Sequence, residues 1–444
     1  MFTSLPGFRE FYPAERALQN HIFDLWRRTA RRFGFQEWDA PVLEPLELFT
    51  EKSGEEIVRQ LFNFEDKGGR KVTLRPEMTP SLARLVAARA GSLRRPIKWF
   101  AIGENFRYEK QQKGRLRSFY QFNADILGEA GPAADAEIIA LCIESLRAFG
   151  FDVEDFRVRL SDRTLWFLFL ESLGIPESAA VPVLAVVDKL ERTSSAELEE
   201  MMADALVGTN CVAIEILPKV KNFVELNSLP ALEQFFSGED TKILARLGEW
   251  KTLLDLLKAM NLESFISIDL TIVRGLAYYT GFVFEAFERT GDGRALAGGG
   301  RYDALVKKLG GSDMPATGFG MGDVTLKNLL EDKSLLPVYS DAPDFYAIVL
   351  DPACRTVALT DVSLLRRAGI RTEYSFKDGK FGKLIQAAEQ AGARYVLVYG
   401  PDEVANGVVK IRDTQERREI TIPSRELVAR LQAVLEGGLA AAES

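Results

Sequence analysis

Apolar residues recur every three or four positions over residues 13–33, as in Leu18, Ile22 and Leu25. This spacing predicts an amphipathic helix that buries one face. Gly34 is typical of the position that follows such a helix, because glycine adopts the left-handed conformation without strain. The chain therefore opens with one helix that packs onto a larger core.

Strand patterning follows this helix. Short apolar segments lie around residues 42–43 and 72–74, and the second leads through Pro76 into a helix expected to begin near Pro80. Residues 102–128 then read IGENFRYEKQQKGRLRSFYQFNADILG, with β-rich flanks on either side of a charged, glycine-containing turn. This pattern predicts two antiparallel strands joined by a long loop.

The second half of the chain changes pattern twice. Helical spacing dominates residues 133–150 and much of 185–260, and strand character returns at 266–287. Pro337 and Pro343, with polar residues between them, mark a linker. Beyond the linker, strand-like and helix-like segments alternate, which predicts a separate α/β domain of about 95 residues.

Composition is ordinary for a soluble globular protein, with 47% hydrophobic and 27% charged residues. A chain of 444 residues has room for roughly two to four domains. Its start lacks the layout of a secretory signal, and no apolar segment approaches the roughly 18 residues of a membrane span. We therefore expect a cytoplasmic protein with no membrane association.

Cysteine and histidine chemistry is disfavoured. Cys142, Cys211 and Cys354 lie far apart, without the paired spacing of a disulfide framework or a zinc site. The single histidine, His21, falls in the first helix, so the commonest general base is missing. A net charge of −8 argues against sequence-blind nucleic-acid binding. The chemistry must rely on carboxylates, arginines, backbone dipoles or a carboxylate-bound magnesium ion.

The hairpin at 102–128 carries the first candidate chemistry. Arg107 on its first strand could hold a phosphate through the planar fork of its guanidinium. The turn adds further cations, among them Lys113, Arg115 and Arg117. The alternative is a solvated charged hairpin, which composition alone favours.

A second motif reads LRPEMTP at residues 74–80. Glu77 and Thr79, two positions apart on a turn between strand and helix, could hold the ammonium group of a ligand. The competing interpretation is helix capping, because threonine suits an N-cap before Pro80.

Two more motifs lie in the strand-rich region beyond residue 266. VRGLAYYTG places Tyr278 and Tyr279 on opposite faces of an expected strand, so that one packs in the core and the other lines a pocket. Arg274 in this apolar segment requires a carboxylate partner or an anionic ligand. The three glycines 298–300 of GGGRYD would let the backbone approach a ligand closely.

Taken in order, LPGFREFYP, TLRPEMT, FRYEKQQKGRLRSFYQ, VRGLAYYTG, GGGRYD and the terminal α/β module closely resemble histidyl-tRNA synthetase over essentially the whole chain. Residues 34–45 are similar to motif 1 of class II synthetases, which forms the dimer interface, and the hairpin is similar to motif 2. The resemblance implies an α+β fold with an antiparallel sheet flanked by helices. It divides the chain into a catalytic core (1–155 and 262–335), a helical insertion over tRNA (156–261) and a C-terminal α/β anticodon-binding domain (343–444).

The resemblance also implies a site, carried over by motif position. The residues expected to contact ATP are Arg107, Glu109, Arg115, Phe119 and Arg274. Those expected to contact histidine are Glu77, Thr79, Gln121, Asp125, Tyr278, Tyr279 and Gly299. Arg107 and Arg274 would act catalytically at the α-phosphate. Asp125, where the family usually has glutamate, would accept a hydrogen bond from the substrate imidazole.

The implied reaction is the ligation of L-histidine to tRNA(His) by a cytoplasmic homodimer, with ATP and Mg2+ and through a histidyl-adenylate. The substrate carboxylate is already a nucleophile at neutral pH, so activation needs alignment and charge neutralisation rather than a histidine base. Arginines and Mg2+ on the triphosphate would supply both. No side chain is assigned to the metal.

Two positions depart from the family pattern. Ala277 replaces the aspartate of RGLDYY, and residues 322–325 read Gly-Asp-Val-Thr where motif 3 usually reads Gly-Leu-Glu-Arg. Thr325 therefore stands where an arginine stacks on adenine, a contact worth roughly 1–2 kcal/mol. The motifs RGLAYYTG and GFGMGD resemble those of a branch of this family that includes plant organellar enzymes. This resemblance favours a working synthetase with an altered adenine pocket.

Two non-catalytic alternatives remain. One is the regulatory subunit of ATP phosphoribosyltransferase, which normally lacks an anticodon-binding domain, so the terminal α/β module counts against it. The other is a paralogue that binds histidine or tRNA without aminoacylation, which the missing motif 3 arginine favours. Histidine-dependent exchange of ATP with pyrophosphate distinguishes these from the enzyme.

Overall fold

The computed structural model describes residues 2–50, 58–109, 116–238, 240–273, 278–289, 295–377 and 379–443. The chain forms two compact units, Met1–Pro337 and Val338–Ser444. Their boundary falls at the linker that the prolines indicate. Each unit has its own sheet and its own hydrophobic core.

An eight-stranded sheet forms the centre of the first unit, in the order β1-β5-β6-β11-β10-β9-β7-β8. Described neighbours pair antiparallel except β1 with β5 and β7 with β8, which are parallel. The strands are β1 (Gln36–Glu37), β5 (Ile97–Phe106), β6 (Ser118–Leu127), β7 (Phe156–Asp162), β8 (Ile266–Ile268), β9 (Phe282–Glu288), β10 (Ala297–Arg301) and β11 (Ala316–Gly322). This antiparallel-dominated sheet with helices confirms the expected fold class.

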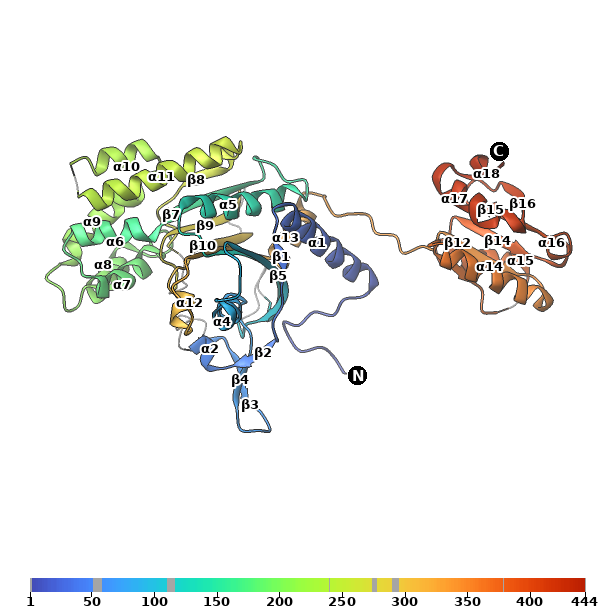
Figure 1. The fold of residues 1–444 in the computed structure, drawn as a ribbon, viewed down its shortest axis with the longest axis horizontal. Helices are drawn as coiled ribbons and strands as arrows, with labels where there is room; N and C mark the ends of the chain where they lie inside the picture. The colour runs from blue at the N-terminus through green and yellow to red at the C-terminus, as the bar shows by residue number, and fades with distance from the viewer. Residues whose placement is uncertain are drawn as a thin grey trace. The chain divides into compact units, whose positions relative to one another are not determined.

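Helices α1 (Pro13–Arg32) and α5 (Pro132–Arg147) cover one face of this sheet (Figure 1). The periodic apolar residues of these helices pack against those of the strands. Trp26 is fully buried, and its ring stacks on that of Phe122 with the centroids 5.6 Å apart. Its indole N–H donates to the sulfur of Met321 at 3.2 Å. Helix α13 (Asp323–Asp332) follows β11 directly. This helix-covered face forms the main core.

Among the described residues, the other face of the sheet is covered only in part, by α4 (Thr79–Arg89) and the short α12 (Leu305–Lys308) (Figure 1). Below them lies a three-stranded sheet of order β2-β4-β3, formed by β2 (Leu43–Pro45), β3 (Phe62–Glu65) and β4 (Lys71–Leu74), with α2 (Glu47–Thr50) beside it. The candidate site lies on this second face of the sheet.

The helices that follow β7 in the described residues form a layer at one end of the sheet (Figure 1). They are α6 (Arg163–Ser172), α7 (Glu177–Val187), α8 (Ser195–Ala205), α9 (Ala213–Val224), α10 (Leu229–Phe235) and α11 (Thr241–Ala259), and the 3-10 turn η1 (Glu263–Phe265) follows. Because β7 pairs within the large sheet, this helical segment begins at Arg163 rather than at the expected 156. In the described part of the chain, no single helix could span a membrane; only α6 and α7 together, a bent pair, have the length and composition for it.

The second unit has a five-stranded sheet of order β13-β12-β14-β15-β16. Its strands are β12 (Phe345–Val349), β13 (Thr372–Tyr374), β14 (Tyr395–Tyr399), β15 (Val408–Asp413) and β16 (Glu419–Pro423). Its helices are η2 (Pro352–Cys354), α14 (Arg355–Arg367), α15 (Phe381–Gln390), α16 (Pro401–Ala405), η3 (Ser424–Glu426), α17 (Leu427–Gly437) and α18 (Leu439–Glu443). The strands β13, β12 and β14 run parallel, as the alternating pattern predicts.

Candidate functional site

Alternation along β6 places four polar or aromatic side chains on the partly covered face of the sheet: Phe119, Gln121, Asn123 and Asp125. The intervening Phe122, Ala124 and Ile126 belong to the main core on the opposite face. The residues of this strand that are expected to contact adenine and histidine therefore lie on the same face of the sheet. On that face, Asn123 and Asp125 are buried.

Glycines on the next strand, β11, make room for these side chains. Gly318 pairs with Asp125, and a Cβ on Gly318 would overlap the carboxylate oxygen Oδ1 of Asp125. A Cβ on Gly320 would lie 2.5 Å from Nε2 of Gln121. Both side chains thus lie flat across β11, which only glycine permits. We call Gly318 and Gly320 the glycine floor of the site.

The expected role of Gly299 needs correction. Gly299 pairs with Phe284 and Phe319 on neighbouring strands, and a Cβ there would lie 2.6 Å from Cβ of Phe319, on the core face. By alternation, Gly298 and Gly300 are the glycines of β10 that face the site. The close approach expected from GGGRYD therefore belongs to the residues on either side of Gly299.

Asp125 is 2% exposed and accepts a hydrogen bond of 2.6 Å from the hydroxyl of Tyr302. Burial raises the pKa of Asp125 to about 7, against the opposing effect of the Tyr302 hydrogen bond. Within the described residues, its second oxygen Oδ2 is buried without a hydrogen-bond partner. A buried acceptor of this kind suits a ligand N–H. Tyr302 belongs to the GGGRYD motif, but no local sequence pattern indicates that it contacts Asp125.

Glu77 and Thr79 lie at the start of α4, against Tyr278. The hydroxyl of Tyr278 donates a hydrogen bond of 2.6 Å to Oε2 of Glu77, and both side chains are buried. Burial and the Glu77 carboxylate raise the pKa of Tyr278 well above its usual value. The N-cap of α4 is Met78, with no side-chain cap bond, so the capping interpretation of Thr79 is wrong.

The two adjacent tyrosines differ from expectation. Tyr278 and Tyr279 precede β9 and lie outside any strand, and both are buried, at 4% and 7% exposed. Their ring centroids are 5.2 Å apart, and both pack in the apolar cluster that includes Tyr302. The expected division into one core and one pocket residue therefore fails, because irregular backbone does not alternate faces.

Arg107 lies where the hairpin leaves the sheet. Its Nε donates to the carbonyl oxygen of Pro76 at 3.0 Å, and its guanidinium lies 5.3 Å from the ring centroid of Phe119. Buried Arg75 supports the same turn by donating to the carbonyl oxygens of Glu104 and Ala40, at 3.0 and 2.8 Å. The structure thus brings the first hairpin strand, Phe119 and the 74–80 turn together.

Several expected site residues lie outside the described residues. These are Arg115 and Arg274, together with Lys113 and Ala277. Glu109 is described and partly buried at the end of the first hairpin strand. The described residues hold no group of three or more His, Cys, Asp or Glu side chains that could bind a metal ion. A magnesium ion here would be held chiefly by substrate phosphates, as is usual for this metal.

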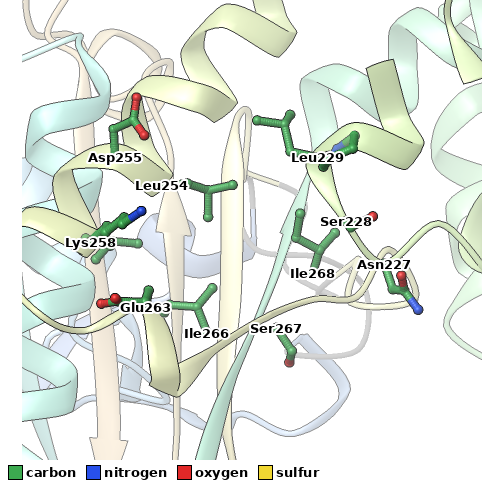
Figure 2. A pocket seen from close by; sticks show the side chains of 12 residues that line it. Asn227, Ser228, Leu229, Leu254, Asp255, Lys258, Glu263, Ile266, Ser267 and Ile268 are labelled. Carbon is green, nitrogen blue, oxygen red and sulfur yellow. The ribbon is translucent and has the colours of Figure 1, made fainter. Parts of the chain in front are cut away.

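A pocket of about 330 Å³ lies elsewhere, between α10, α11 and β8 (Figure 2). Strand β8 is the edge of the large sheet, separated from β6 by β11, β10, β9 and β7. Apolar side chains of Leu254 and Ile268 line it beside the charged Asp255 and Lys258. This pocket is therefore distinct from the cluster around Asp125 and Arg107.

A largely antiparallel sheet with helices on one face, a long hairpin carrying an arginine and a phenylalanine, and a following strand and helix define a catalytic domain of the class II aminoacyl-tRNA synthetases. Residues 7–325 match the family model described as "Histidyl-tRNA synthetase", and residues 344–434 match the "Anticodon binding domain" model. The chain belongs to the histidyl-tRNA synthetase family.

Relatives agree along nearly the full length. The chain is 52% identical to the "Histidine--tRNA ligase" of Opitutus terrae over 96% of this chain and 97% of the relative. It is 37% identical to the "Histidine--tRNA ligase, chloroplastic/mitochondrial" of Arabidopsis thaliana, over 91% and 82%. The crystal structure of histidyl-tRNA synthetase from Nostoc sp. PCC 7120 shares the fold, with a TM-score of 0.78 at 24% identity, over 97% of this chain and 99% of that one.

Proposed function

We propose that this protein joins L-histidine to tRNA(His) in two steps, using ATP. In the first, a histidine carboxylate oxygen attacks the α-phosphorus of ATP and pyrophosphate leaves, giving histidyl-adenylate. In the second, a ribose hydroxyl of the tRNA attacks the acyl carbon and AMP leaves. The observation that carries this proposal is the buried oxygen Oδ2 of Asp125 over the glycine floor, which has no hydrogen-bond partner among the described residues, within a chain of this family.

The histidine subsite is the cluster around Asp125. Its free oxygen Oδ2 would accept from an imidazole N–H, while Tyr302 holds the other oxygen. Glu77, oriented by Tyr278, would accept from the α-ammonium with Thr79 and Gln121. A site that satisfies a substrate N–H with a buried carboxylate discriminates strongly against analogues lacking that group. This arrangement favours histidine over residues of similar size.

The ATP subsite lies beside it at the hairpin. Arg107 would hold the α-phosphate and Phe119 would stack on adenine, while Glu109 contacts the adenine side. Arg115 and Arg274 are included among the proposed ATP-contacting residues because of their positions in the motifs alone. Mg2+ bound to the triphosphate would neutralise charge on the leaving pyrophosphate. The protein's share is to align the carboxylate with the α-phosphorus and to surround the developing charge with fixed cations.

No protein base is required for either step. The attacking carboxylate is ionised at neutral pH, and the departing pyrophosphate takes up no proton before it leaves. In the second step, the proton of the ribose hydroxyl can pass to a phosphate oxygen of the adenylate. This accounts for a site built from carboxylates, arginines and glycines in a chain with a single histidine, His21, on α1.

The remaining domains would serve tRNA and assembly. We propose that the helices from Arg163 to Ala259 lie over the tRNA acceptor end and that residues 343–444 bind the anticodon, which the match of residues 344–434 supports. A homodimer through residues 34–45 is supported by the exposure of Val42 and Leu43, at 37% and 42%. We place the enzyme in the cytoplasm, which cell fractionation tests.

The test is histidine-dependent exchange of ATP with pyrophosphate, followed by charging of histidine tRNA. We expect both activities in the wild-type protein and near-complete loss of exchange in Arg274→Ala, with its oligomeric state unchanged. Absence of exchange in folded wild-type protein would contradict the proposal. Exchange without charging would identify a histidine-activating paralogue, and normal exchange in Arg274→Ala would show that the catalytic cation is elsewhere.

A further inference from the structure

The N-terminal segment, residues 5–12, lies against the point where the hairpin strands leave the sheet. The carbonyl oxygen of Gly7 accepts hydrogen bonds from the N–H groups of Arg117 and Ser118, at 3.0 and 3.2 Å. Gly7 has a φ of +87°, and a Cβ there would lie 2.8 Å from Cγ of Arg117. Only glycine allows this approach. The segment is therefore bonded to the first residues of the second hairpin strand.

Aromatic contacts extend this attachment. The ring of Phe8 lies 5.8 Å from that of Phe62 on β3 and 6.3 Å from that of Phe106 at the end of β5. The ring of Phe11 lies 6.3 Å from that of Tyr120 on β6. The segment thus contacts both hairpin strands and the small sheet, and packing of this kind limits movement between them.

An ion pair fastens the same segment to α13. Nη2 of Arg9 lies 2.8 Å from Oδ2 of Asp323, whose side chain is almost fully buried. The other oxygen of Asp323 accepts from the backbone N–H of Tyr120 at 3.0 Å. Burial raises the pKa of Asp323, and Arg9 opposes that effect. One carboxylate therefore joins the N-terminal segment, the hairpin and the first turn of α13.

A short path leads from this attachment to the proposed ATP subsite. The N–H of Arg117 donates to Gly7, and the carbonyl oxygen of the same residue accepts from the N–H of Arg107 at 2.9 Å. The guanidinium of Arg107 in turn lies over Phe119. Two successive backbone hydrogen bonds thus separate the N-terminal segment from the arginine proposed for the α-phosphate.

We propose that Arg9 is a positioning residue for ATP: paired with Asp323, it fixes the N-terminal segment, which holds Arg107 and Phe119 in place. This inference rests on the proposed function. Asp323 stands where motif 3 usually has leucine, and Thr325 stands where it usually has arginine. An adenine pocket without that arginine depends more on Phe119, and the Arg9–Asp323 pair holds the strand that carries it.

The test compares Arg9→Met and Arg9→Lys with Lys327→Met as the matched control. Lys327 lies one turn along α13 from Asp323, lines the same pocket as Arg9 and Asp323, and pairs with Glu331 at 3.3 Å. In exchange assays, we expect Arg9→Met to raise KM for ATP about tenfold and KM for histidine less than about twofold. Arg9→Lys should recover part of the loss, and Lys327→Met should match the wild type.

An unchanged KM for ATP, or equal rises in both KM values, would overturn the inference, because a general loss of structure affects both substrates. If Arg9→Met does not fold, Asp323→Asn and Arg9→Lys provide the same comparison. If the wild type shows no exchange, the proposed function fails separately. Calorimetric affinity for ATP in the wild type and the Arg9 variants then tests the inference, and equal affinities, or none in the wild type, would overturn it.

Discussion

The hydroxyl of Tyr302 donates a 2.6 Å hydrogen bond to Asp125 across the strand that lies between them. Tyr302 directly follows β10, Asp125 lies on β6, and β11 runs between with Gly318 opposite Asp125. Because a tyrosine hydroxyl has one proton to donate, it orients one carboxylate oxygen and leaves the other for a ligand. The Tyr302 hydroxyl and the Asp125 carboxylate can meet because Gly318 has no side chain between them.

The first prediction concerns this hydrogen bond. Tyr302→Phe leaves both oxygens of a buried carboxylate without that donor, so we expect KM for histidine to rise about tenfold, while KM for ATP changes little. Steady-state exchange kinetics measure both. Tyr399→Phe is the matched control, because Tyr399 donates to Asp361 at 3.1 Å in the other unit. Equal effects of the two substitutions on KM for histidine would contradict the role of Tyr302.

The second prediction concerns pH and stability. Burial raises the pKa of Asp125 from 3.8 to about 7. A raised acid pKa means that folding favours the protonated form, so this contribution to stability is complete below about pH 4 and is lost as pH rises to about 7. Relative to Asp125→Asn, the free energy of unfolding of the wild type should fall over that range by up to about 4 kcal/mol.

Urea unfolding of the two proteins at pH 4 to 8 tests this expectation. Other buried carboxyl groups with raised pKa values, such as Asp135 and Asp323, are present in both proteins and cancel in the difference. Added histidine should reduce the loss above pH 7, because an imidazole N–H would favour the ionised carboxylate. Parallel stability curves for the two proteins would show that Asp125 does not titrate in this range.

Regular elements were predictable because their periodicity is local. Apolar spacing placed the first helix at 13–33, and it spans Pro13–Arg32. Strand patterns likewise placed the hairpin, which spans 97–106 and 118–127. Such signals depend only on which face of an element is buried.

Features that depend on contacts between distant segments were not predictable. Gly318 and Gly320 leave space for Asp125 and Gln121 only because of the register of β11 against β6. No local sequence pattern predicts that register. The local pattern predicts a strand with Tyr278 and Tyr279 on opposite faces, yet tertiary packing holds them in irregular backbone. The ion pair of Arg9 with Asp323 joins residues near the two ends of the first unit's sequence.

The third prediction concerns the glycine floor. Gly318→Ala places a methyl group against Oδ1 of Asp125 and 2.8 Å from the carbonyl oxygen of Ala124. We expect at least a tenfold loss of histidine affinity, measured by calorimetry. Gly248→Ala is the control: it lies within α11 with nothing within 4 Å of the added methyl group, so it should stabilise the protein slightly. Normal histidine binding by Gly318→Ala would place the subsite elsewhere.

The fourth prediction concerns the connection between the helical layer and the site. Arg246 on α11 donates from Nε and Nη2 to both oxygens of Asp162, at 2.6 and 2.8 Å, and the indole N–H of Trp250 donates to the same carboxylate at 2.9 Å. Asp162 is fully buried and also caps α6 by accepting from the N–H of Thr164. The hydroxyl of Thr164 donates to the carbonyl oxygen of Thr280, directly after the two site tyrosines.

Arg246→Met should therefore lower the free energy of unfolding by about 3–5 kcal/mol, because it leaves a buried carboxylate without its charge partner. The double variant Arg246→Met/Asp162→Asn should recover part of that loss, since no unpaired charge remains. Lys242→Met serves as control: Lys242 forms an exposed ion pair with Glu171 at 3.8 Å, worth at most about 1 kcal/mol. Because these contacts run from Arg246 through Asp162 to the segment of the site tyrosines, we expect KM for histidine to rise in Arg246→Met even at temperatures where the variant is fully folded. An unchanged KM there would confine Arg246 to holding α11 on the sheet.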